Sequence, residues 1–150
     1  MRNTFLVEII CIMFIVLFVY AAVSKLLDYE SFVHEIRTSP LLKDRSSSYF
    51  LSRHTAWLLP VIELLIAAIL IPEGIRVKGL YLAIMLMSIF TIYIIYIITY
   101  SPFVPCSCGG VINKLTWTQH LWLNLGFILI GVVAIRMNRT YRKHYNVEQR

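Results

Sequence analysis

The sequence predicts an all-α membrane protein, a four-transmembrane-helix bundle with a short amphipathic helix in the first outer connection. Composition is the first reason: of 150 residues, 59% are apolar and 15% charged, and the mean hydropathy is +0.73. The second is four apolar stretches, at about residues 5–27, 55–71, 79–100 and 117–137, each close to the roughly 17 to 25 residues that a spanning helix needs. Helices are expected because a segment in lipid must satisfy its own backbone hydrogen bonds.

The first apolar stretch, residues 5–27, follows a basic start at Arg2. A basic start and an apolar run also describe a signal peptide, and Val19-Tyr20-Ala21 would serve as a weak cleavage site. The apolar register continues past that point to Leu27. We therefore expect this stretch to be retained as a membrane span.

The longest polar segment, residues 28–54, contains an amphipathic pattern. Tyr29, Phe32, Val33 and Ile36 recur at near-helical spacing with polar residues between them. This pattern predicts a short helix at the membrane interface, which Pro40 would end.

The second and third spans are bounded by turn residues. The second contains Pro60 and Glu63 and stops at Pro72-Glu73-Gly74. The third is rich in isoleucine and tyrosine, which favour strand in water, but its length in lipid favours helix. Pro102 and Pro105 end it.

The fourth span begins with a capping signal. Thr116 and Gln119 have capping-box spacing, which predicts a helix start there. No internal repeat or long linker is evident, so we expect a single integral membrane domain over residues 1–150, with a basic cytoplasmic tail at 138–150.

The net charge of +6 is concentrated at the C-terminus, where the last fifteen positions hold five of the fourteen basic residues. Nucleic-acid binding is disfavoured, because no reading module accompanies the charge. By the positive-inside rule this tail and the basic turn at 76–78 face the cytoplasm. The prediction is a multi-pass protein of a bacterial inner membrane, with N-in/C-in topology and the 101–116 connection on the oxidising, periplasmic side.

The stretch from Pro105 to Gly110 holds the most reactive chemistry, a Cys-x-Cys formed by Cys106 and Cys108. A disulfide in so small a ring is strained and easily reduced, which favours a redox pair. A static loop disulfide is one alternative. A metal pair is another, with His34, His54 or His120 as further ligands. Cys11 is expected to be a small apolar filler.

Three ionisable residues near or within the spans are further candidates. Glu63 lies about 12 Å into its span at 1.5 Å per residue, where an ionisable group is costly and often functional. Lys25 is expected either to reach the interface or to lean inward and pair with Glu63. His120 is a possible proton carrier near the thiols and shares a helix face with Asn124. For Glu63 and His120, purely structural roles are the alternative.

Several of these residues, in order, resemble the MauE family (methylamine utilisation protein MauE), one of the DoxX-like redox-associated membrane proteins. The resemblance covers roughly residues 5–135. The residues that carry it are Ser24-Lys25-Leu26, Phe32 and Ile36, Pro60-x-x-Glu63-Leu64 and Cys106-Ser107-Cys108-Gly109-Gly110. The family commonly has Gly and Phe where this chain has Ser107 and Gly109, and His120 stands near the place of a basic residue, so the chain resembles a divergent member.

The resemblance implies a four-helix inner-membrane protein linked to disulfide formation or electron transfer for periplasmic proteins. The expected partners besides the lipid bilayer are a periplasmic thioredoxin-like protein or a disulfide-containing client. Whether the protein is itself a thiol-disulfide oxidoreductase component is left open. No cofactor is evident, although electrons could pass to a quinone, as in analogous four-helix enzymes. The rival hypotheses are a non-enzymatic assembly factor that binds through residues 28–54, with a static disulfide, and a metal-handling protein.

Overall fold

The computed structural model describes residues 2–38, 48–100 and 117–148, and these residues fold into helices without any strand. The helices are α1 (Arg2–Leu27), α2 (Tyr29–Thr38), α3 (Ser48–Leu70), α4 (Arg76–Tyr100) and α5 (Trp117–Glu148). Four of them are long and apolar enough to cross a membrane, over Phe5–Leu27, Phe50–Leu70, Arg76–Thr99 and Thr118–Asn138. The predicted all-α class and four spans are confirmed.

The helices extend further than the apolar stretches that predicted them. α3 already begins at Ser48 and α4 at Arg76, and α5 continues to Glu148 through most of the segment expected as a tail. Once a helix exists, each added residue gains one hydrogen bond for the one residue that is fixed, whereas the first turn must fix three residues for its first bond. Polarity therefore marks where a helix leaves the membrane better than it marks where the helix ends.

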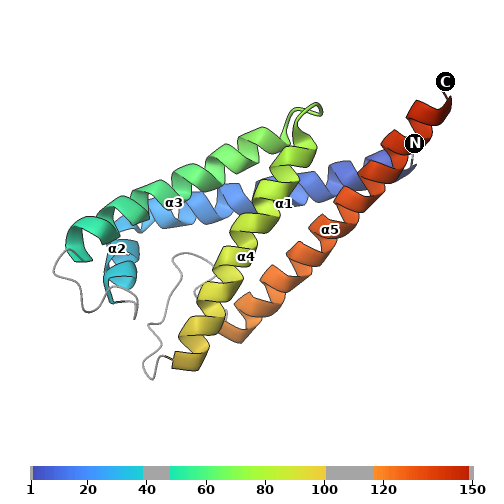
Figure 1. Ribbon diagram of the computed structural model, residues 1–150. Coiled ribbons are helices and arrows are strands. Elements are labelled where there is room, and N and C mark those ends of the chain that lie inside the picture. Colours follow the sequence, from blue (N-terminus) through green and yellow to red (C-terminus); the bar gives the residue numbers. More distant parts are fainter. Residues whose placement is uncertain (1, 39–47, 101–116, 149–150) are drawn as a thin grey trace.

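The bundle is built from two antiparallel pairs (Figure 1). α1 packs most extensively on α3, and α4 on α5, while α1–α5 and α3–α4 contacts join the pairs. The start of α1 and the end of α5 lie at the same end of the bundle. At the opposite end α1 and α4 finish and α3 and α5 begin.

The short helix α2 lies against α3. Its Phe32 and Val33 are buried together with Ala56 of α3. The Tyr29 hydroxyl donates a hydrogen bond to the Arg53 carbonyl oxygen at 3.1 Å. The predicted amphipathic helix is confirmed, and its apolar face brings Phe32 to the end of the bundle where α1 and α4 finish.

The main core lies in the half of the bundle that contains the start of α1. Phe14 is fully buried there, with ring centroids 6.2 Å from Phe18 and 5.3 Å from Phe127 in an edge-on arrangement. Cys11, 2% exposed, belongs to the same cluster, as expected of an apolar filler. Because lipid is as apolar as these side chains, such a core is held by close packing more than by the hydrophobic effect.

A glycine marks a close approach of α5 to α4 and α1. A Cβ atom on Gly131 would lie 2.9 Å from Cγ1 of Ile84 and 3.1 Å from Cζ of Phe14, whereas one on Gly126 would meet nothing within 4 Å. Small residues allow this kind of contact between membrane helices.

Gly131→Ala should therefore lower the free energy of unfolding by about 1 to 3 kcal/mol through overpacking. Gly126→Ala, one and a half turns away on the same helix, should be neutral or slightly stabilising, since alanine is the better helix former. Unfolding of both variants in mixed detergent and SDS micelles, followed by circular dichroism, measures the difference. Equal effects would contradict the close contact at Gly131.

Candidate functional site

A buried ion pair joins the end of α1 to the middle of α3. Lys25, in the last turn of α1, contacts Glu63 Oε1 through its Nζ atom. The Glu63 side chain is 1% exposed and that of Lys25 is 16% exposed. Charges inside a membrane protein are expensive to desolvate and are tolerated when paired. The Lys25 side chain was expected either to reach the interface or to lean inward and pair with Glu63. In the structure it leans inward and forms the pair.

Aromatic rings from two other helices surround the lysine. Its Nζ atom lies 5.8 Å from the ring centroid of Phe32 on α2 and 5.5 Å from that of Phe90 on α4. Both distances lie within the range in which a ring face attracts a cation. The ammonium group is thus held by one carboxylate and two rings, which come from three different helices.

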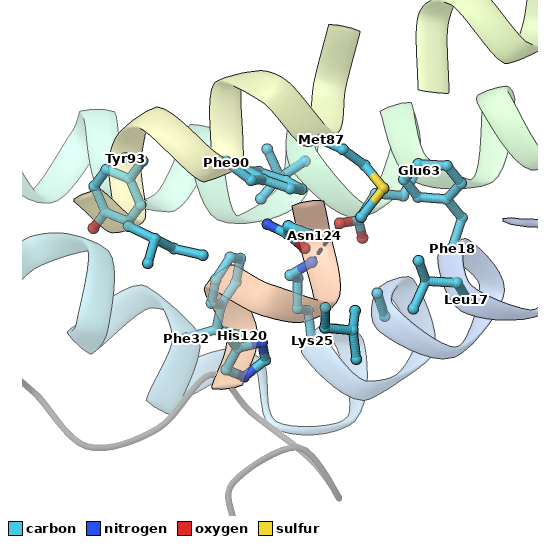
Figure 2. A pocket seen from close by; sticks show the side chains of 14 residues that line it. Leu17, Phe18, Lys25, Phe32, Glu63, Met87, Phe90, Tyr93, His120 and Asn124 are labelled. Atoms are coloured by element: carbon cyan, nitrogen blue, oxygen red, sulfur yellow. Dashed lines mark hydrogen bonds and ion pairs between the residues drawn. The ribbon is translucent and has the colours of Figure 1, made fainter. Parts of the chain in front are cut away.

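The ion pair forms part of the wall of a cavity of about 180 Å³ to which all five helices contribute (Figure 2). Most of its lining is apolar, and the aromatic side chains among it are Phe18, Phe32, Phe90 and Tyr93. The cavity lies toward the end of the bundle where α1 and α4 finish and α5 begins. An apolar pocket with a few convergent polar groups is the usual form of a small-molecule site.

Polar groups from α5 face the same cavity. His120 and Asn124 both line it, and Asn124 is buried. Figure 2 shows Asn124 beside the Lys25–Glu63 contact and His120 below Phe32. The sequence predicted that these two residues share one helix face. In the structure that face is turned toward the ion pair.

One atom of the ion pair has no partner among the described residues. Glu63 Oε1 receives the lysine, but Oε2 is buried and accepts no hydrogen bond from the part of the chain that the structure describes. Leaving a buried acceptor unsatisfied costs about 1 to 3 kcal/mol, and more for a charged group. The cavity therefore presents an acceptor that a bound donor would satisfy.

Lys25, Glu63 and His120, each predicted separately as a candidate, are brought together in this cavity. The predicted redox residues Cys106 and Cys108 lie outside the described residues. Within the described ranges, no three histidine, cysteine, aspartate or glutamate side chains gather as metal ligands.

The aromatic wall was missed by sequence reasoning. A signal existed on α1, where Phe18 and Lys25 are seven positions apart and hence share a helix face, and on α2, where Phe32 belongs to the predicted apolar stripe. No comparable signal existed for Phe90 and Tyr93, because α4 is apolar on every side.

Comparison with known proteins gives one finding, at the level of the family. No curated protein and no solved structure matches the chain. Residues 3–137 match the sequence model of the family described as methylamine utilisation protein MauE. Since this match spans most of the 150 residues, the chain belongs to the MauE family.

Proposed function

We propose that this MauE-family protein supports thiol-disulfide exchange or electron transfer for the maturation of periplasmic proteins, with Cys106 and Cys108 as its redox pair. The observation that carries the proposal is the polar cluster of Lys25, Glu63 and His120 in one membrane-embedded cavity. His120 follows Cys108 by twelve positions and lies in the first turn of α5. A bundle that needed only to fold would have little reason to keep so many polar groups at that end.

The exchange is a two-step reaction between the Cys106–Cys108 disulfide and a client dithiol. A client thiolate attacks one sulfur of the pair, so that a mixed disulfide forms and the other cysteine leaves as a thiolate. The second client thiol then attacks the client sulfur, which releases the oxidised client. Two electrons pass to the pair, and the two client protons end on its two thiols.

A periplasmic thioredoxin-like protein in its disulfide form reoxidises the pair by the same exchange in reverse. Each attack needs a thiolate, and a histidine is the side chain best suited to take up and return a proton near neutral pH. His120 is the residue to which we assign this proton transfer. The Lys25–Glu63 pair lines the same cavity and would help to position His120.

Trapping the mixed disulfide tests this proposal. In Cys108→Ser, the Cys106 thiolate should attack the disulfide of the thioredoxin-like protein, and the resulting mixed disulfide should persist, because the Cys108 thiol that would release it is gone. We expect a new band on non-reducing gels of intact cells, which reductant removes and mass spectrometry identifies. The Cys106→Ser/Cys108→Ser variant keeps Cys11 and is the matched control, with no adduct expected. A double variant that still supports full maturation of periplasmic disulfide proteins, with no adduct in the single variant, would refute the redox role.

The membrane side of the pair is tested separately by labelling. A membrane-impermeant maleimide should label Cys106 and Cys108 in intact cells only after mild reduction. Cys11, buried in the core, should stay unlabelled under both conditions. Labelling that requires lysed cells would reverse the proposed N-in/C-in orientation.

A non-enzymatic assembly factor is the second candidate function. The observation that favours it is α2, which packs on α3 while Glu30, Ser31 and His34 remain exposed. A partner would dock on this polar face, and the cysteines would form a static disulfide. In that case, cysteine variants should lower stability without trapping any partner.

A further inference from the structure

We propose that the cavity beside Lys25 and Glu63 binds a single aromatic ring that carries a hydroxyl group. A membrane hydroquinone head group and a free phenol share this chemistry. The inference goes beyond thiol exchange, because it depends on no cysteine. Three features of the cavity carry it: its size, its walls and the chemistry of its polar end.

The volume suits one ring. An engineered apolar cavity of about 150 Å³ binds benzene, and this cavity measures about 180 Å³. The difference leaves room for a substituent or two on the ring.

The walls suit a flat ring more than an aliphatic chain. Phe18, Phe32, Phe90 and Tyr93 come from three helices and face the cavity from different sides. Aromatic pairs in offset or edge-on contact gain about 0.5 to 1.5 kcal/mol beyond the burial of their area. Met87 also lines the cavity, and its sulfur makes favourable contacts with ring edges.

The polar end calls for a group that both donates and accepts. Glu63 Oε2 is buried and needs a donor, while the Lys25 ammonium carries three N–H donors of which Glu63 Oε1 takes one. A hydroxyl group donates one hydrogen bond and accepts others. It can therefore donate to Oε2 and accept from Lys25 at the same time.

Other ligands satisfy only part of the site. A carboxylate would meet the negative charge of Glu63. A benzene ring without a hydroxyl would leave Oε2 unsatisfied, and a lone water molecule would leave the aromatic walls uncovered. The hydroxylated ring is the class that matches the volume, the walls and the unpartnered oxygen together.

Fluorine NMR on the full chain in lipid nanodiscs tests the inference with 4-fluorophenol and 4-fluoroanisole. The methyl ether keeps the ring but cannot donate to Glu63. Both compounds partition into lipid, so the signal to measure is the saturable shift beyond that of empty nanodiscs. We expect the phenol to bind at least tenfold more tightly than the ether. Equal affinities, or no saturable binding of the phenol, would overturn the proposal.

A pair of variants on α1 locates the binding. Ala21 lines the cavity, so Ala21→Leu should fill it and weaken phenol binding at least tenfold. Val23 is exposed on the lipid-facing side of the same helix, and Val23→Leu should leave binding unchanged. If both variants bound the phenol alike, the cavity would not be the site. The phenol and ether comparison on the unmodified chain decides the matter even if Ala21→Leu does not fold.

The source of the ring is distinguished by competition. Hydroquinone and the same ring with a ten-carbon alkyl chain are each titrated against bound 4-fluorophenol, with concentrations expressed per lipid. Stronger displacement by the alkylated ring would indicate a membrane hydroquinone, and equal displacement would indicate a free phenol. Either result supports the ring site, whereas displacement by neither compound would overturn it. Repeating the titration on Cys106→Ser/Cys108→Ser should give the same affinities.

Discussion

Replacing Lys25 by methionine should lower the free energy of unfolding by about 3 to 5 kcal/mol. The change leaves the carboxylate of Glu63, whose side chain is 1% exposed, in an apolar cavity without its cation. Glu63→Leu should have a smaller effect, near the lower end of that range. Lys25 lies in the last turn of α1, so its long side chain can reach outward to the interface once its partner is gone.

The double variant Lys25→Met/Glu63→Leu should recover most of the lost stability. Replacing both members of a buried ion pair with apolar residues of similar size is often neutral or stabilising. A double-mutant cycle in mixed micelles should therefore give a coupling energy of about 2 kcal/mol or more. Glu73→Gln, an exposed carboxylate in the turn before α4, is the control and should change stability by less than about 0.5 kcal/mol. Additive single effects would show that the pair contributes no coupling.

The cycle also separates folding from function. If the pair served only to hold α1 against α3, the double variant would support client maturation as the unmodified chain does. In the proposed function its polar groups help to position His120, so the folded double variant should lose thiol exchange. Its cysteines should then accumulate in one redox state under maleimide labelling.

The spans could be predicted because lipid leaves few alternatives. An apolar stretch of twenty residues in a bilayer has only its own backbone for hydrogen bonding, so composition alone implies a helix. The amphipathic helix was visible from the spacing of Phe32, Val33 and Ile36. The ends of the helices were harder to predict, because polar residues do not stop a helix: α3 continues through Ser52, Arg53 and His54 without a break.

The site was only partly predictable, because spacing fixes faces within one helix but not the rotation of one helix against another. His120 and Asn124 could be placed on one face of α5, yet nothing in their spacing shows that this face meets Glu63. For the same reason Lys25 had two open orientations. On α4, Phe90 and Tyr93 line the cavity while Ile89 and Ile92 are exposed, a division that hydropathy does not record.

Phe14→Ala should be the most damaging single truncation in the apolar core. Phe14 is fully buried and packs against Phe18 and Phe127, so truncation leaves a cavity between α1 and α5. In water-soluble cores such a change costs about 3 to 5 kcal/mol. Part of that figure is the transfer of the side chain out of water, which largely disappears when the unfolded helices remain in lipid. We expect a loss of about 2 to 3 kcal/mol from the missing packing contacts.

Phe5→Ala on the same helix provides the matched control. Phe5 is 62% exposed and faces lipid, so its truncation should change stability by less than about 0.5 kcal/mol. Because Phe14 lies in the half of the bundle away from His120, the folded fraction of Phe14→Ala should keep the labelling pattern of Cys106 and Cys108. A variant that lost thiol exchange while it remained folded would instead couple the apolar core to the candidate site, and the two halves of the bundle would then act as one unit.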